Sequence, residues 1–516
     1  MKRLGTAMKR AGGRRSAGVG ALLLGALLLA AAAPASKKLS TLELALKTHV
    51  ETLASDEFQG REPGTEGETM TLRYLARQWF DIGMEAGTNI PGSGWFAPVD
   101  LVEREPVMSR ASFMRGRKKV VLPDQSVFVV TSGLRSLVQE APLLFVGHAA
   151  SPGMPRAELS GRVAVMLDSM PAGADPQKAG DRAGRLLDAG ALAVVTLLDG
   201  ERGLEDVIAR RNRAGYAVSG ERIGNEIEAF LSPATAELLL AGTPHAKVAK
   251  LRSDAAAPLF APYLLGLNGT FEATSRETRI RTHNLIGRIP GRNPAAGAVL
   301  LLAHWDHFGQ CAQAPAEDLI CNGAIDNASG LAVVTEAARV LAKGRPMDRD
   351  VYVVATTGEE LGLLGAMAFA ENPPIPLDRI VAAFNVDSTG LVPAGRPIGI
   401  VGKGMTPLDP LIGDIVRRMK RKLAPGDGAN AYIKRQDSWV LMQHDVPAVM
   451  VSSSYGDMER IERFMEDTYH RPGDQAGAGI DYSGMADDVA LQVELVRAFA
   501  DARRYPARES GRRQTP

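Results

Sequence analysis

The sequence predicts an α/β fold built on a mostly parallel sheet with helices on both faces. Three apolar runs, at residues 298–303, 351–355 and 380–384, have the length of buried strands, and helical patterns lie between them. Each run is apolar at consecutive positions instead of alternate ones, which is typical of strands covered on both sides. Strand-like runs punctuated by glycine and proline at residues 138–256 predict a small β-rich inserted domain that interrupts this sheet.

Residues 1–35 predict a signal peptide. Six Lys and Arg residues among the first 15 positions precede an apolar run at 17–33, and Ala33-Pro34-Ala35 fits a small-x-small cleavage site. The apolar run is also near the lower length limit of a membrane-spanning helix, so an uncleaved anchor is the alternative. We expect export from a bacterial cell, to the periplasm or outside, without stable membrane insertion after cleavage.

The rest of the chain divides into four segments. Residues 36–137 should form the N-terminal part of the main domain, because a helical pattern of apolar residues runs from Met70 to Trp79 and ends at Gly83. The insert at 138–256 carries strand-like runs at 142–147, 161–167 and 190–196 and a helical stretch at 178–189. The main domain resumes at 257–505, and the polar, basic tail at 506–516 is expected to be disordered.

Polar residues follow the three apolar runs of the main domain. His304 comes directly after the first run, Glu359 and Glu360 follow the second, and Asp387 follows the third. Because ligands gather at the carboxyl ends of parallel strands, these side chains are expected to converge. Taken singly, each has an ordinary structural interpretation, as a core histidine or a solvated carboxylate. A charge at the end of a hydrophobic strand is costly unless something pairs with it, so the pattern favours a metal site.

Asp326 precedes a helical run at 331–341, where the helix dipole favours a carboxylate with or without a metal. At these positions the chain resembles the dizinc exopeptidase family that contains secreted bacterial aminopeptidases, glutamate carboxypeptidase II and glutaminyl cyclase. The resemblance is carried by His304-x-Asp306-His307, Asn322-Gly323-Ala324-x-Asp326-Asn327-Ala328-Ser329-Gly330, Gly358-Glu359-Glu360-x-Gly362-x-x-Gly365, Asp387 and Tyr469-His470-x-Pro472-x-Asp474. The insert is similar to the protease-associated domain found in many of these exopeptidases.

The resemblance implies two zinc ions per chain. It makes His304 and Asp387 ligands of one ion, Glu360 and His470 ligands of the other, and Asp326 the bridge between them.

The resemblance also implies the roles of the residues around the ligands. Glu359 would be the general base, which takes a proton from the attacking water and gives it to the leaving amine. Asp306 would orient a ligand imidazole, and Tyr469 would donate to the oxyanion, although ordinary aromatic packing explains Tyr469 equally well. The segment that contains Arg435 and Asp437 would line the substrate pocket, while His307 and His444 are interpreted as structural or supporting residues.

The function implied is a secreted zinc aminopeptidase acting on peptides. The alternatives are glutaminyl cyclase chemistry or carboxypeptidase or dipeptidase chemistry on the same scaffold, or a binding ectodomain that has lost its metals. The chain of 516 residues, 45% of them hydrophobic, is long enough for a large and a small core. Its formal net charge of +1 gives no reason to expect a nucleic-acid partner. The oligomeric state is not predicted.

Cys311 and Cys321 are the only cysteines of the chain, and they lie between His304 and Asp326. The predicted signal segment sends them to an oxidising compartment, which favours a disulfide. Metal binding by these thiols is the alternative, but the ligand set implied by the resemblance is already complete without them.

Overall fold

The computed structural model describes residues 39–506 except 150–154, 172, 174–180, 201, 212–214, 220–223 and 478. The predicted signal segment and almost all of the predicted tail at 506–516 lie outside these residues. Residues from Thr41 onward group into one compact unit. Within the described ranges, no helix combines the length and the apolar character needed to cross a bilayer.

Four parallel strands form the centre of the main sheet, in the spatial order β17-β15-β11-β14. They are β11 (Ala298–His304), β14 (Asp350–Thr356), β15 (Ile380–Asn385) and β17 (Ala448–Ser452). The first three contain the apolar runs at 298–303, 351–355 and 380–384, so these predicted strands are confirmed. The short β16 (Gly399–Val401) pairs antiparallel with β17, and the long β10 (Tyr263–Ile289) pairs antiparallel with β14.

Successive residues of the central strands enter hydrophobic cores on opposite sides of the sheet. Val299, Leu301 and Ala303 of β11 belong to one core, whereas Leu300 and Leu302 belong to the other. Both sets are almost completely buried, as consecutive apolar residues in a doubly covered strand must be. The predicted fold class, a mostly parallel sheet covered on both faces, is confirmed.

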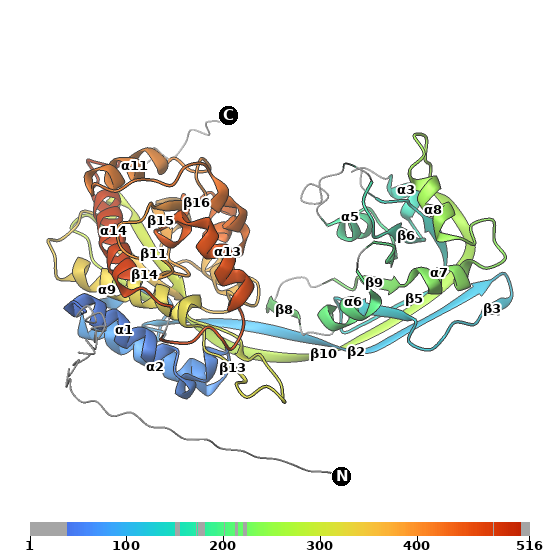
Figure 1. The fold of residues 1–516 in the computed structure, drawn as a ribbon, viewed down its shortest axis with the longest axis horizontal. Helices are drawn as coiled ribbons and strands as arrows, with labels where there is room; N and C mark the ends of the chain where they lie inside the picture. The colour runs from blue at the N-terminus through green and yellow to red at the C-terminus, as the bar shows by residue number, and fades with distance from the viewer. Residues whose placement is uncertain are drawn as a thin grey trace, which may run out of the picture. The chain divides into compact units, whose positions relative to one another are not determined.

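Among the described residues, five helices cover the side of the sheet that bears Val299, Leu301 and Ala303. They are α1 (Thr41–Leu53), α2 (Glu66–Asp81), α9 (Gly330–Ala342), α11 (Asp409–Arg418) and α14 (Tyr482–Ala500). In Figure 1, α1 and α2 from the start of the chain lie beside α9 and α14, and their residues are in contact. The shorter α10 (Leu364–Glu371) and α12 (Ser438–Gln443) contribute to the cores on the other side. Helix α13 (Met458–Asp467) packs through Ile461 into a small core that also contains Val401 of β16 and Met450 of β17.

Short turns and two-residue strands connect these elements. The turns are η1 (Asp56–Arg61), η2 (Pro294–Ala296), η3 (Ala324–Ser329), η4 (Leu377–Arg379), η5 (Gly428–Arg435) and η6 (Ser454–Gly456). Strand β1 (Glu85–Ala86) pairs with β10, and β12 (Gly309–Gln310) pairs with β13 (Ile320–Cys321) in a small hairpin.

Strand β10 also leads into the β-rich segment. Over most of its length it pairs antiparallel with β2 (Phe96–Arg115), from Leu285 opposite Phe96 to Asn268 opposite Met114. The remaining strands here are β3 (Lys118–Val120), β4 (Val127–Thr131), β5 (Arg135–Phe145), β6 (Val163–Leu167), β7 (Ala193–Leu197), β8 (Gly215–Val218) and β9 (Ile227–Leu231). The helices are α3 (Arg156–Leu159), α5 (Arg182–Asp188), α6 (Leu204–Arg211), α7 (Pro233–Leu240) and α8 (Val248–Ala255).

These strands and helices enclose a second hydrophobic core. It draws buried residues from Phe113 to Ala273, a wider range than the predicted insert at 138–256, because β2 and β10 run on into it. Residue contacts do not separate this segment from the rest of the unit that begins at Thr41. A separately folding insert therefore stays a prediction.

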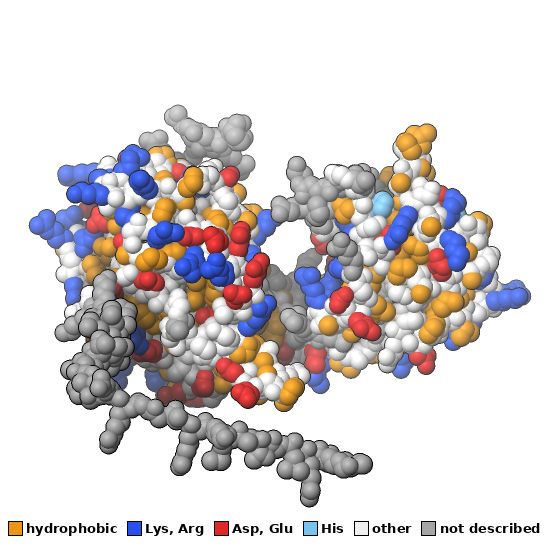
Figure 2. Space-filling model, in the orientation of Figure 1, with side chains coloured by type: hydrophobic (Ala, Val, Ile, Leu, Met, Phe, Trp, Pro, Cys, Tyr) orange, Lys and Arg blue, Asp and Glu red, His pale blue; other side chains and the backbone are white. Residues whose placement is uncertain are grey.

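The surface carries charges of both signs. Acidic and basic side chains are interspersed on the face shown in Figure 2, in keeping with the formal net charge of +1.

Candidate metal centre

The ends of three neighbouring parallel strands carry three candidate ligands and the candidate base. His304 is the last residue of β11, Asp387 lies two residues after β15, and Glu359 and Glu360 lie three and four residues after β14. Because β14, β11 and β15 are adjacent and parallel, these ends meet at one edge of the sheet. The predicted convergence of these side chains is what the structure shows.

Asp326 reaches the same place from the turn η3, which precedes α9. The backbone N–H groups of Ile325 and Asp326 donate to the Asp474 carboxylate at 2.9 and 3.0 Å, which fixes the turn. Gly323 has a φ of 55°, and a Cβ there would lie 2.0 Å from the Asp326 carbonyl oxygen and 2.7 Å from the His307 ring. Only glycine fits at this position, as a close backbone approach requires.

The carboxylate of Asp326 presents one oxygen to each of two histidines. His304 Nε2 lies 3.1 Å from Asp326 Oδ1, and His470 Nε2 lies 3.3 Å from Asp326 Oδ2. His304 Nε2 is also 3.7 Å from Asp387 Oδ1, and His470 Nε2 is 2.9 Å from Glu360 Oε2. Two ligands at about 2.0–2.2 Å from one tetrahedral zinc ion are separated by about 3.3–3.6 Å. The four distances, which run from 2.9 to 3.7 Å, lie close to that range.

One polar atom in the cluster has contacts that hydrogen bonding does not explain. His470 Nε2 is buried and makes no hydrogen bond of acceptable geometry, although two carboxylates lie within 3.3 Å of it. A nitrogen that faces carboxylate oxygens without donating to them has the arrangement of a metal ligand. The donor types and this orientation fit zinc.

Glu359 and Glu360 are adjacent but face different partners. Glu360 Oε1 lies 2.6 Å from His307 Nδ1, and Glu360 Oε2 faces His470. Glu359 Oε2 is 4.0 Å from His304 Nε2, and their donor atoms together with that of Asp387 lie within 4.8 Å of one another. Glu359 therefore lies at the side of the cluster where His304 and Asp387 meet.

Burial and crowding shift the pKa values of the cluster. Burial raises the pKa of Glu359 well above its usual range and that of Asp306 to about 7. Burial alone would lower the pKa of His470, but the Asp326 and Glu360 carboxylates raise it to about 9. So many carboxylates in one buried place favour a bound cation.

Asp306 supports the cluster in two ways. Its carboxylate accepts hydrogen bonds from the backbone N–H groups of Glu359 and Glu360, at 3.1 and 3.3 Å. Its backbone carbonyl oxygen lies 3.2 Å from His304 Nδ1, closer than its own carboxylate, which is 3.8 Å away. The orientation of the His304 ring therefore depends on the carbonyl, whereas the carboxylate holds the segment that bears the two glutamates.

His307 has a role that the sequence analysis left unspecified. Its contact with Glu360 orients that carboxylate, and its Nε2 is buried without a hydrogen-bond partner. The adjacency of His307 to the motif at His304 and Asp306 is the signal that could have indicated this role. His444, by contrast, directly follows α12 and caps its C-terminal end.

The predicted substrate residues differ in position. Tyr469 and Arg435 line a small pocket together with Asp326, Glu359 and Asp387. The ring of Tyr469 stacks on that of His470, and the Arg435 guanidinium lies 5.3 Å from the centre of the Tyr469 ring.

Asp437 does not face this pocket, which differs from the predicted substrate contact. It is 0% exposed, and its Oδ2 accepts a hydrogen bond of 2.5 Å from Thr356 Oγ1 at the end of β14. The physical reason is that the chain enters α12 at Asp437, which turns this side chain toward the sheet instead of toward the substrate.

Cys311 and Cys321 form a disulfide in the structure. It closes the hairpin of β12 and β13, which lies between His304 and Asp326 along the chain and contacts the turn η1. The sulfur atoms are therefore not metal ligands.

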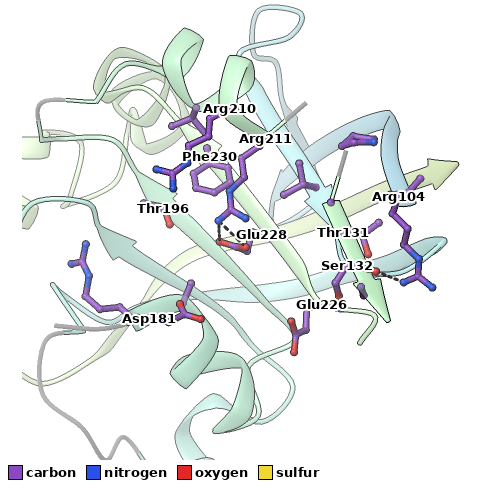
Figure 3. A pocket seen from close by; sticks show the side chains of 18 of the residues that line it. Arg104, Thr131, Ser132, Asp181, Thr196, Arg210, Arg211, Glu226, Glu228 and Phe230 are labelled. Carbon is purple, nitrogen blue, oxygen red and sulfur yellow. Dashed lines mark hydrogen bonds and ion pairs between the residues drawn. The ribbon is translucent and has the colours of Figure 1, made fainter. Parts of the chain in front are cut away.

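A much larger cavity, of about 960 Å³, lies in the β-rich segment (Figure 3). Several of its charged side chains have partners. Arg211 pairs with Glu228, and Arg104 donates to the Ser132 carbonyl and pairs with Glu277. It contains no histidine or cysteine among the described lining residues. The chemistry of the protein therefore points to the small pocket at the ends of β11, β14 and β15.

Comparison with known proteins gives a family for the region that holds this cluster. Residues 284–496 match the model of peptidase family M28. The alkaline phosphatase isozyme conversion protein of Escherichia coli is 34% identical over 106 residues, which are 19% of this chain and 30% of that protein. The aminopeptidase YwaD of Bacillus subtilis is 42% identical over 69 residues, 13% of this chain and 15% of that protein. The matched segments thus span less than a third of either relative.

The fold is shared with a solved structure over most of the chain. An aminopeptidase from Aneurinibacillus sp. strain AM-1 superposes with a TM-score of 0.54 at 16% identity, covering 89% of this chain and 93% of that one. At this identity the likeness concerns the fold alone. The five ligand candidates and Glu359 all lie within residues 284–496, the region that matches the model of peptidase family M28.

Proposed function

We propose that this chain is a zinc-dependent aminopeptidase whose site holds two zinc ions. The observation that supports it best is the Asp326 carboxylate, which presents one oxygen to His304 and the other to His470. His304 would hold one ion with Asp387, and His470 would hold the other with Glu360. The nitrogen and oxygen donors of this set are those that zinc prefers.

Two zinc ions bound here would lower the pKa of a shared water and polarise the carbonyl of the scissile peptide bond. Glu359 is the general base of the proposal, because it is the one carboxylate of the pair with no histidine closer than 4.0 Å. It would accept the proton of the attacking water on Oε2 and deliver it to the nitrogen of the leaving amine.

The substrate would be a peptide with a free N-terminus. Its ammonium group is a cation, and the small pocket offers the carboxylates of Glu359 and Asp387 to it. Tyr432, Met450 and Tyr455 supply apolar surface next to these carboxylates, which suits an apolar first side chain. Tyr469 lines the same pocket, so its phenol would donate to the oxygen of the tetrahedral intermediate.

The proposal includes export. The positively charged start, the apolar run at 17–33 and the small-residue site at Ala33-Pro34-Ala35 support cleavage of a signal peptide. The β-rich segment around 138–256 is proposed to limit access to the site without supplying a ligand. All five candidates lie outside it.

The test is hydrolysis of aminoacyl arylamides by purified, zinc-loaded protein. We expect release of the arylamine from at least one apolar aminoacyl substrate and loss of that activity in Glu359→Gln. Cyclisation of N-terminal glutamine without arylamide hydrolysis would replace the proposal by glutaminyl cyclase chemistry. Release of C-terminal residues only would indicate a carboxypeptidase, and zinc binding without any turnover would leave a binding protein.

A further inference from the structure

Arg61 is a fully buried cation next to the candidate metal centre. Its side chain is 0% exposed, and all its hydrogen bonds go to backbone carbonyl oxygens. These carbonyls belong to Trp305 at 2.8 Å, Leu53 at 2.8 Å, Asn322 at 2.6 Å, Gly323 at 2.9 Å and Asp326 at 3.5 Å. A guanidinium has five N–H donors, so these contacts use its whole donor capacity.

Four of the five carbonyls come from the two segments that carry His304 and Asp326. Trp305 directly follows His304, and Gly323 and Asp326 belong to the start and the middle of the turn that positions the Asp326 carboxylate. Leu53 is the last residue of α1, so the same side chain ties both segments to a helix. Buried carbonyls without a donor would cost free energy, and no other described side chain donates to this group of carbonyls, although the Gly323 carbonyl also accepts from the Ala328 N–H at 3.1 Å.

The backbone of the turn that contains Arg61 has an unusual conformation. Gln59, Gly60 and Arg61 have φ values of 51°, 66° and 54°, all in the left-handed region. A Cβ on Gly60 would lie 2.6 Å from the Cys321 carbonyl oxygen and 2.8 Å from Gly309 Cα. The turn therefore packs closely against the hairpin that the disulfide closes. Left-handed residues other than glycine are uncommon, and their occurrence here indicates a position maintained by its surroundings.

The charge of Arg61 also opposes that of the cluster. Burial lowers the pKa of Arg61 to about 10, so it remains a cation at neutral pH, and Asp474, Asp326, Asp306 and Glu360 act against that lowering. The guanidinium therefore reduces the mutual repulsion of carboxylates that must lie close together.

We propose that Arg61 is a positioning residue for the metal centre, which holds the His304 and Asp326 segments at the separation that two zinc ions require. The inference rests on the proposed function. The part of the centre that depends on Arg61 is formed by the backbone, so it should be present before any metal binds. Arg61 would then raise zinc affinity by reducing the ordering that binding must otherwise accomplish.

Arg349 provides a matched control. It is also 0% exposed and also donates to backbone carbonyls, those of Ala296 at 2.8 Å and Phe499 at 2.6 Å. It directly precedes β14, at the end of that strand opposite to the one that leads to Glu359. Replacing it removes a buried arginine without touching the segments of His304 or Asp326.

The experiment compares Arg61→Lys and Arg61→Met with Arg349→Lys and Arg349→Met. Zinc dissociation constants are measured by competition with a chromophoric chelator, below the unfolding temperature of each metal-free variant. We expect roughly 10–100-fold weaker zinc binding in Arg61→Lys, as for other residues that orient ligands, and weaker binding still in Arg61→Met. The Arg349 variants should lose thermal stability but keep the affinity of the wild type.

Equal zinc affinity in the Arg61 variants and the wild type would overturn the role of Arg61, and so would equal losses in the two series. Wild-type protein that binds no zinc would instead contradict the proposed function, so the two failures are distinguishable.

A second measurement does not depend on the variants folding. In metal-free wild-type protein, the amides of Ile325 and Asp326 should be protected from hydrogen exchange, because Arg61 and Asp474 hold this turn. Exchange at unprotected rates there, with protection appearing only on addition of zinc, would show that the metal and not Arg61 orders the segment.

Discussion

Reduction of the disulfide between Cys311 and Cys321 should destabilise the part of the protein that holds the candidate metal centre. The bond closes the hairpin of β12 and β13, and Cys321 is fully buried. The carbonyls of the next two residues, Asn322 and Gly323, accept hydrogen bonds from Arg61. Loosening this hairpin therefore releases a segment that leads directly to Asp326.

The size of the effect follows from the length of the closed loop. The two cysteines are separated by 10 positions. In the chain-entropy model, closure of a loop of this length removes about 9 cal/mol/K from the unfolded state, which is about 2.7 kcal/mol at 25 °C. We expect the free energy of unfolding to fall by about 2–3 kcal/mol on reduction.

The assay is denaturant unfolding of metal-free protein, oxidised or reduced, followed by tryptophan fluorescence. All four tryptophans, at positions 79, 95, 305 and 439, lie outside residues 138–256, so the signal reports on the main domain. Cys311→Ala is the control. This variant cannot form the disulfide, so reductant should not change its unfolding curve. In the zinc-loaded enzyme, reduction should raise KM or lower the melting temperature before zinc is lost. Identical unfolding curves for oxidised and reduced wild type would refute the reasoning.

Three further outcomes are expected. Glu359→Gln should lower kcat by roughly 10²–10⁴-fold with zinc content unchanged, because it removes a proton acceptor and not a ligand. A parallel fall in zinc content would mean that Glu359 and Glu360 have exchanged roles. Asp326→Ala should remove more zinc than Glu360→Ala, measured by elemental analysis after dialysis, because a bridging carboxylate serves both ions. Similar zinc retention in these two variants would contradict the bridge. Burial raises the pKa of Asp488 to about 6, above its value in an unfolded chain, so the native state binds this proton more tightly. The resulting stability is complete below about pH 4 and is lost as the pH rises through about 6, by about 3 kcal/mol at most. Asp488→Asn should flatten the pH dependence of the unfolding free energy in that window, and an unchanged slope would show that Asp488 does not cause it.

The parallel strands are predictable because burial on both sides leaves a local mark. Residues 298–303 are apolar at every position, and the structure distributes them between two cores. The polar residue that follows each such strand is equally visible in the sequence. For this reason His304, Asp387 and the glutamate pair could be proposed together before any geometry was known.

What the sequence could not predict depends on contacts between distant segments. Arg61 joins carbonyls that lie 244 and 265 positions further along the chain, so nothing near Arg61 indicates its partners. Asp437 was expected in the pocket because the resemblance concerned its whole segment, but the start of α12 turns its side chain inward. The second core reaches beyond residues 138–256 because β2 and β10, which lie on either side of that range in the sequence, pair with each other and extend into it.

Anomalous scattering from zinc-saturated crystals, measured at the zinc absorption edge, tests the central claim most directly. We expect two peaks roughly 3.5–4 Å apart, one next to His304 and Asp387 and the other next to Glu360 and His470, with the Asp326 carboxylate between them. A single peak, or two peaks that do not share Asp326, would contradict it.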